Sequence, residues 1–167
     1  MASAATYTPI QTQTVSGSTT NTIIFSSIPQ TYTDLVLIAS TLSTVASYSH
    51  IQVGNGSVDT GSNYSATILY GNGSTAGSIR RTNQPNFDVI YSTGDSATAT
   101  AIVHFMNYSN STTYKTMLAR GNYTSSDVEV DVNTWRSTSP INIITLTQGS
   151  GYLIAGSTFT LYGILAA

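Results

Sequence analysis

Cysteine is absent from this chain of 167 residues, and charged residues are scarce. Without cysteine there can be no disulfide and no thiolate metal site, so stability must come from packing, hydrogen bonds or assembly. The chain has five Lys and Arg and seven Asp and Glu, which together make 7% of the sequence, against about 25% in typical soluble domains. Because Ser and Thr supply about a third of the positions, we expect a surface of hydroxyl and amide groups.

The shortage of charge also excludes some partners. The formal net charge is −2, so the attraction and counterion release that drive nucleic-acid binding are mostly missing. No apolar run approaches the ~20 residues that cross a bilayer. The opening segment MASAATYTPI lacks the basic and apolar regions of a signal peptide. We therefore expect no nucleic-acid partner and no membrane partner, and a chain that is soluble when made.

A period of two dominates the pattern of side chains. Short runs of β-branched and aromatic residues are separated by Gly, Asn, Ser and Asp, which predicts strands and turns. About ten short strands favour an all-β fold, an antiparallel β-sandwich of jelly-roll type. We expect one domain over residues 21–167, since a chain of this length makes a single domain. The candidate strands cover residues 10–15, 22–27, 35–42, 48–53, 64–70, 86–91, 98–106, 114–120, 128–133, 141–147 and 158–164.

The first twenty residues differ from the rest of the chain. They combine a small-residue start with Tyr7-Thr-Pro-Ile and an alternating Gln-Thr-Gln-Thr. One interpretation is an N-terminal edge strand, because Pro9 is tolerated near the start of such a strand. The other is an arm that becomes ordered only when it adds a strand to the sheet of a neighbouring subunit.

The chain offers little material for catalysis. A hydrolase or transferase needs a nucleophile, a base and an orienting group, and the two histidines, His50 and His104, are far apart in the sequence. His104 lies among apolar residues, as a core or interface histidine does. Neither phosphate-binding glycine pattern occurs. We therefore predict a protein that is not an enzyme and that needs no cofactor.

Three acidic residues, Asp127, Glu129 and Asp131, recur at every second position. In a strand this spacing places all three on one face. Because Val128-Glu-Val-Asp-Val alternates cleanly, we expect the valines to point inward and the acids to form a solvated outer face that discourages edge pairing. A second hypothesis is a site for Ca²⁺ or another hard cation. A third is a set of ion pairs with Lys115, Arg120 or Arg136.

The aromatic residues could form a binding surface. Eleven tyrosines and a single Trp135 offer broad contact area to a sugar or a protein at low entropic cost. The simpler interpretation is that tyrosine fills the rims of the sandwich core. Trp135 follows a predicted strand, and we expect it to pack across one end of the sandwich.

Four segments carry a family resemblance. They are Tyr7-Thr-Pro-Ile, Ser27-Ile-Pro-Gln-Thr-Tyr-Thr-Asp-Leu-Val-Leu, Asn107-Tyr-Ser-Asn-Ser-Thr-Thr-Tyr-Lys-Thr and Gly156-Ser-Thr-Phe-Thr-Leu-Tyr-Gly-Ile. In these segments, and over nearly its whole length, the chain resembles small virion structural proteins of tailed bacteriophages. Such proteins are β-sandwich modules that decorate capsids or form parts of tails and fibres, and the resemblance brings no catalytic residues.

The resemblance implies a capsid decoration, or cement, protein that is made in the host cytoplasm and lies on the outer surface of the virion. Its partners would be the major capsid protein and copies of itself, in a homotrimer that clamps neighbouring capsomers. Tyr7, Pro9 and Ile10 are the residues expected to dock, with Trp135 as a further contact. The alternative is a tail-fibre or receptor-binding module whose polar loops hold glycans of the host surface; a depolymerase is a weaker third reading, because paired carboxylates are lacking.

Overall fold

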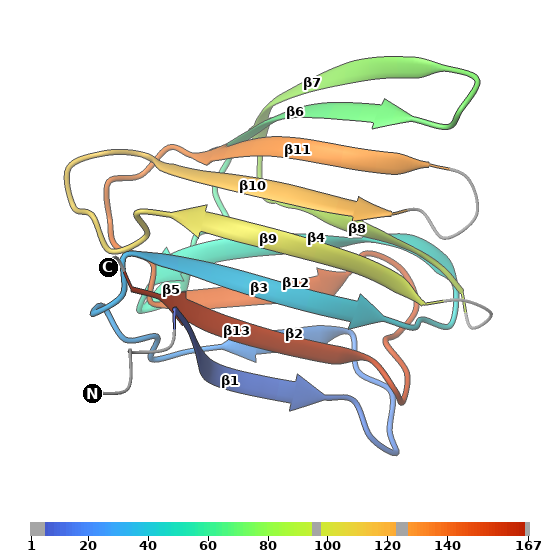
Figure 1. Ribbon diagram of the computed structural model, residues 1–167, viewed down its shortest axis with the longest axis horizontal. Coiled ribbons are helices and arrows are strands. Elements are labelled where there is room, and N and C mark those ends of the chain that lie inside the picture. The colour runs from blue at the N-terminus through green and yellow to red at the C-terminus, as the bar shows by residue number, and fades with distance from the viewer. Residues whose placement is uncertain (1–5, 95–97, 123–126, 166–167) are drawn as a thin grey trace.

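The computed structural model describes residues 6–94, 98–122 and 127–165, and it confirms an all-β sandwich (Figure 1). Within these ranges the chain forms 13 strands in two antiparallel sheets and no helix. A helix long and apolar enough to cross a membrane is accordingly not found in the described ranges. The eight-stranded sheet faces the viewer in Figure 1, and the smaller sheet lies behind it.

The strands are short, as the alternating runs predict. Their bounds are β1 Tyr7–Thr14, β2 Thr22–Phe25, β3 Asp34–Thr41, β4 Ala46–Asn55, β5 Ser57–Val58, β6 Tyr64–Gly71, β7 Ala76–Gln84, β8 Phe87–Thr93, β9 Ala99–Met106, β10 Lys115–Asn122, β11 Val128–Trp135, β12 Ile143–Gln148 and β13 Thr158–Ile164. The last of these coincides with its predicted range, and most of the others differ from theirs by one to three residues at an end.

The strand order joins distant parts of the chain. The larger sheet runs β1-β13-β3-β9-β10-β11-β6-β7, and the smaller runs β2-β12-β4, with β5 and β8 also paired to β4. The pairs β1 with β13 and β3 with β9 form in the larger sheet, while β2 with β12 and β4 with β8 form in the smaller. These four pairs are nested in sequence. The hairpins β6–β7 and β10–β11 widen only the larger sheet, so that β6 and β7 extend past the smaller one (Figure 1).

The core lies between the two sheets where they overlap. Strand β9 alternates buried and partly exposed residues along its length, as a strand with one covered face must. Its inward side chains Val103 and Phe105 meet those of β3, β12 and β4 in one apolar cluster. The largest apolar side chains that are fully buried in this cluster are Phe25, Leu35, Leu37, Ile51, Tyr64, Phe105, Tyr108, Met117, Ile141, Ile144 and Phe159.

Strand β7 is absent from the sequence-based prediction. Its residues Ala-Gly-Ser-Ile-Arg-Arg-Thr-Asn-Gln show no alternation, because β7 is a mostly exposed edge strand. The hairpin that joins β6 to β7 does follow from the sequence. Gly73 adopts a left-handed conformation with φ of 84°, and the Asn72 side chain accepts hydrogen bonds from the backbone N–H groups of Ser74 and Thr75. This is the turn chemistry that Asn-Gly favours.

The N-terminal segment forms an edge strand of its own subunit. Strand β1 pairs with β13 from Tyr7 to Thr14, with an irregularity between Pro9 and Gln11. Pro9 is exposed on this edge, and Ile10 packs partly buried against the core. This pairing within the chain is the arrangement that the edge-strand interpretation predicts.

Candidate functional site

The outer face of the eight-stranded sheet carries a row of large side chains. Ile38 of β3 pairs with Ile102 of β9, which pairs with Arg120 of β10. Arg120 pairs in turn with Val130 of β11, and Val130 with Leu69 of β6. Ile38, Val130 and Leu69 are exposed hydrophobic residues, and Arg120 is also exposed. The row crosses five neighbouring strands and is apolar except at its centre.

A second row lies beside the first. Val36, His104, Leu118, Val132 and Thr67 are neighbours across the same five strands. Val132 is exposed, and His104 and Leu118 are half-buried. Together the two rows form the apolar docking face, a name we keep below for Ile38, Leu69, Ile102, Leu118, Val130 and Val132 with Arg120 at the centre. Scattered exposed hydrophobic residues are ordinary, whereas a contiguous set often marks an interaction site.

The valines of β11 correct a sequence-based prediction. We expected Val128, Val130 and Val132 to point inward, but they are 63%, 42% and 48% exposed, while Asp131 is 2% exposed. The alternation is therefore present with its two faces exchanged. The inner side of β11 reaches the apolar core at Trp135, whereas Asp131 and Asn133 point into a polar cluster at the flank of the sandwich.

Arg120 lines two hollows in the docking face. A shallow one of about 380 Å³ is lined by Ile38, Thr100, Ala101, Ile102, Arg120, Gly121 and Asn122. A smaller one of about 60 Å³ is lined by Tyr7, Val36, Ile102, His104, Leu118 and Arg120. The guanidinium thus lies between a larger recess with apolar walls and a smaller, more polar one, where it can meet the side chains of a binding partner.

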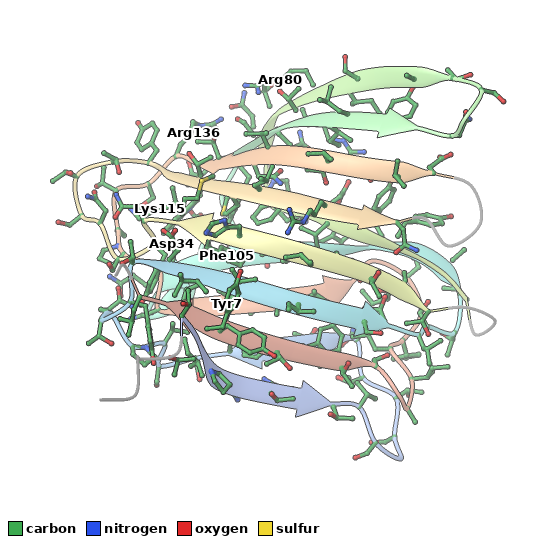
Figure 2. The ribbon with its side chains drawn as sticks, viewed as in Figure 1. Tyr7, Asp34, Arg80, Phe105, Lys115 and Arg136 are labelled. Carbon is green, nitrogen blue, oxygen red and sulfur yellow. The ribbon has the colours of Figure 1, made fainter. Side chains whose placement is uncertain are left out.

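The three N-terminal residues predicted to dock lie on different sides of β1. Tyr7 is 54% exposed and contacts Tyr162 edge to face, with ring centroids 6.0 Å apart. Figure 2 places Tyr7 near the edge of the sheet opposite to Arg80, and its ring borders the smaller hollow. Pro9 is exposed, whereas Ile10 faces the core. Tyr7 therefore belongs to the same outer face as Arg120, and Ile10 has a structural role.

Trp135 lies in the core, unlike a docking contact. It is 3% exposed, and its indole Nε1 donates a hydrogen bond of 2.8 Å to Asp59 Oδ2. Burial raises the pKa of Asp59, but the hydrogen bonds from Trp135, Asn63 and Gly61 outweigh that effect and lower it overall. Trp135 thus holds a loop at the end of the sandwich, and its buried ring leaves little surface for a partner.

The outer face of the smaller sheet is different in character. Its residues Thr22, His50, Gln52 and Thr147 carry hydroxyl, imidazole and amide groups. Ile24 is an exposed apolar exception. The two outer faces of the sandwich therefore contrast: the smaller sheet presents mainly groups that water solvates well, and the larger sheet presents apolar surface.

A buried polar cluster lies where the larger sheet overhangs the smaller one. Asp131 and Asn133 point inward from β11, are 2% and 0% exposed, and have side-chain atoms without a hydrogen-bond partner. The pKa of Asp131 is raised to about 7, chiefly by burial and in part by the Glu129 carboxylate, while the Arg81 guanidinium opposes the rise. Glu129 accepts a hydrogen bond of 3.1 Å from Tyr48 Oη. The face that we predicted to be solvated is thus enclosed.

Histidine and aspartate pair twice in the structure. His50 Nδ1 lies 2.5 Å from Asp88 Oδ1, and Arg81 contacts the other oxygen of Asp88. Burial and the Arg81 charge lower the pKa of His50. His104 Nε2 lies 3.1 Å from Asp34 Oδ2 on the outer face. Both pairs join neighbouring strands, and neither histidine has a hydroxyl nucleophile among the partners that the described residues supply.

The remaining hypotheses for the acids of β11 can be compared with the geometry. No three acidic or histidine side chains of the described ranges meet in a group that could hold a metal ion. The basic residues considered as ion-pair partners point elsewhere. Lys115 donates to the carbonyl oxygens of Thr113 and Thr138. The Arg136 guanidinium donates to oxygen atoms of Ser62, Ser65 and Asn83.

Sequence reasoning missed the docking face because its residues come from five strands. The signal that could have found it is the alternation in β11, because only one of the two sets, the valines or the acids, can face the interior of the sandwich.

Comparisons of the chain with protein-family models, with curated protein sequences and with solved structures return no match.

Proposed function

We propose that this chain is a virion structural protein of a tailed bacteriophage and that it decorates the capsid as a cement protein. One observation carries the proposal, namely the contrast between the apolar outer face of the larger sheet and the hydroxyl-rich face of the smaller one. A protein that covers a shell needs one face that packs and one that water solvates. The family resemblance of the sequence supports the same role.

We also infer that the sandwich is a jelly roll. The nested pairs β1 with β13, β2 with β12, β3 with β9 and β4 with β8 alternate between the two sheets. A jelly roll folds eight strands in two sheets by wrapping long antiparallel pairs in this way. In this interpretation, the hairpins β6–β7 and β10–β11 are additions that widen one sheet and create most of the apolar docking face.

The proposed partners are the major capsid protein and further copies of this chain in a homotrimer. A shell multiplies each contact by the number of copies, so a single interface of standard size, about 1,600 Å² in total, suffices for firm attachment. The chain would lie on the outer surface of the virion after assembly in the host cytoplasm. No step of this function requires a catalytic group, a cofactor or a nucleic acid.

Quantitative mass spectrometry of purified particles tests this proposal. We expect the chain to be present at about one copy per shell subunit, or one per three, because cement proteins follow the symmetry of the shell. The control is a structural protein of the tail, counted in the same sample. A ratio below about one in twenty would contradict decoration of the capsid. It would favour the tail-fibre alternative, whose test is binding of the purified chain to glycans of the host surface.

A further inference from the structure

We propose that the apolar docking face binds a folded protein surface that is itself apolar and presents a carboxylate to Arg120. The inference rests on the proposed function for the identity of the partner, which would be the capsid shell subunit. The chemistry follows from this chain alone. The residues concerned are Ile38, Leu69, Ile102, Leu118, Val130 and Val132 around the Arg120 guanidinium.

Arg120 differs from the other basic side chains. Arg80 donates to a threonine hydroxyl, Arg81 pairs with a carboxylate, and Lys115 and Arg136 donate to several oxygen atoms. Within the described ranges, the Arg120 guanidinium has neither a hydrogen bond nor an ion pair, and it is exposed. Among the contacts that the described residues make, this guanidinium is therefore the basic group left available for a partner.

The surroundings of Arg120 favour a strong contact. Apolar neighbours on three sides would exclude water once a partner is bound, and this raises the strength of a charged hydrogen bond. A guanidinium binds a carboxylate through two parallel hydrogen bonds. Arginine inside a ring of apolar contacts is a common form of interface hot spot. The larger hollow beside Arg120 would receive an apolar side chain next to the acid.

The size of the sheet suits such a partner. Eight strands spaced ~4.8 Å apart, each about eight residues long at ~3.3 Å per residue, give an outer face on the order of 900 Å². A standard interface takes about 800 Å² from each partner. The apolar docking face would form the dry core of this contact, and the hydroxyl-rich margins of the sheet would form its polar rim.

The same charge argument disfavours a second copy of this chain as the occupant. The acid opposite Arg120 would have to come from the other copy, yet none of its described carboxylates is both exposed and unpaired. Asp131 and Asp88 are buried, and Asp127 has a buried oxygen. The others hold hydrogen bonds, as follows: Asp34 with His104 and Asn107, Asp59 with Trp135, Asn63 and Gly61, and Glu129 with Tyr48.

Occupancy of particles by variants provides the first test. We would produce virions with R120A, with V130D and with R80A, and count this chain by mass spectrometry. R80A is the matched control, since Arg80 is an exposed arginine on the edge strand β7 of the same sheet. We expect about tenfold or greater loss of R120A and V130D at limiting concentration, and full occupancy by R80A. Thermal unfolding of each purified variant shows that the loss is not misfolding.

The outcomes separate the two proposals. If the unmodified chain is itself scarce on the capsid, the proposed function fails. If the chain is abundant and R120A and V130D are retained at full occupancy, the docking inference fails while the proposed function stands. If R120A instead dissociates an oligomer of the purified chain, the face belongs to a second copy, and the inference about the partner is overturned.

Chemical crosslinking identifies the carboxylate directly. In R120K an amine replaces the guanidinium, and a carbodiimide joins an amine to a nearby carboxylate as an amide. We expect a crosslinked peptide that joins position 120 to an Asp or Glu of the capsid shell subunit, and none at this position in the unmodified chain, which has a guanidinium there and no amine. A crosslink to another copy of this chain would overturn the inference. So would a nuclease-sensitive attachment, because the acid would then be a phosphate.

Discussion

Asp131 should make the stability of this protein fall as the pH rises. Its side chain is 2% exposed, and the structure provides no partner for its Oδ1 atom. Burial raises the pKa to about 7 from an ordinary value of 3.8, with Glu129 adding to the rise and Arg81 opposing it. The folded protein therefore favours the protonated acid at a pH where the unfolded chain is ionised.

The sign and size of the effect follow from this difference. An acid whose pKa is higher in the folded state destabilises the fold when it ionises. Below about pH 3 both states are protonated and Asp131 has no effect. The loss grows as the pH rises and is complete above the folded pKa, where it amounts to about 4 kcal/mol. About 3 kcal/mol of this is lost between about pH 5 and about pH 8.5.

The variant D131N tests this reasoning, because an amide has the shape of the protonated acid and no charge. The free energy of unfolding would be measured by urea titration of both proteins at the two pH values. We expect the unmodified protein to lose about 3 kcal/mol more than D131N on going to the higher pH. The pKa of His50 is lowered, so His50 makes stability rise with pH in the range below the ordinary histidine pKa. Both proteins contain His50, so its effect cancels in the difference between them.

A second variant checks the cause. E129Q removes the neighbouring carboxylate that raises the pKa of Asp131, so the loss of stability should be smaller and should be complete at a lower pH. Parallel pH profiles for the unmodified protein and D131N would refute the assignment of the effect to Asp131. So would a loss of stability toward low pH that D131N abolishes.

Two further substitutions test the packing of the sandwich. A Cβ at Gly163 would lie 2.4 Å from the ring of Tyr32, so G163A should cost roughly 1–3 kcal/mol by overpacking, and Y32A in the same chain should relieve it. The hydroxyl of Tyr64 accepts a hydrogen bond from Val53 N and lies within 3.1 Å of two carbonyl oxygens. Y64F should therefore cost about 1–3 kcal/mol, since a buried N–H is left unpaired. Both losses are measured by chemical denaturation, and an unchanged midpoint would contradict either assignment.

The strands of the overlapping region could be predicted from the sequence because the local pattern and the global environment agree there. In β13 (Thr158–Ile164) and β9 (Ala99–Met106) every second residue is apolar and faces the core. Strand β7 could not be predicted in this way. It is held by its pairing with β6 and has almost no buried face, so the apolar period that identifies a strand is missing.

The candidate site was harder to predict, for a different reason. The alternation of β11 was predicted correctly, but which set of its side chains faces inward was not. That depends on what covers each face of the strand, which is set by the topology of the whole sandwich. Arg120 and Val130 become neighbours only through the pairing of β10 with β11. Tyr7 was expected at a contact surface, and the structure places it beside the smaller hollow. Ile10 and Trp135 were expected at the same kind of surface, but Trp135 lies in the core and Ile10 packs against it.

The exchange of faces in β11 connects stability with the proposed role. Among the described residues of β11, only Trp135 at its end belongs to the apolar core, so turning the valines inward would gain little burial within the subunit. Turning them outward places them beside Leu69 and Leu118 on a continuous surface. The cost is a carboxyl held inside with a raised pKa. Because large exposed apolar surfaces favour association, and burial of such surface in a contact returns about 25 cal/mol per Å², this arrangement is favourable when a partner covers the face. If D131N stabilises the isolated protein at high pH and R120A reduces attachment without changing stability, the two effects would show that the polar flank serves the fold and the outer face serves the partner.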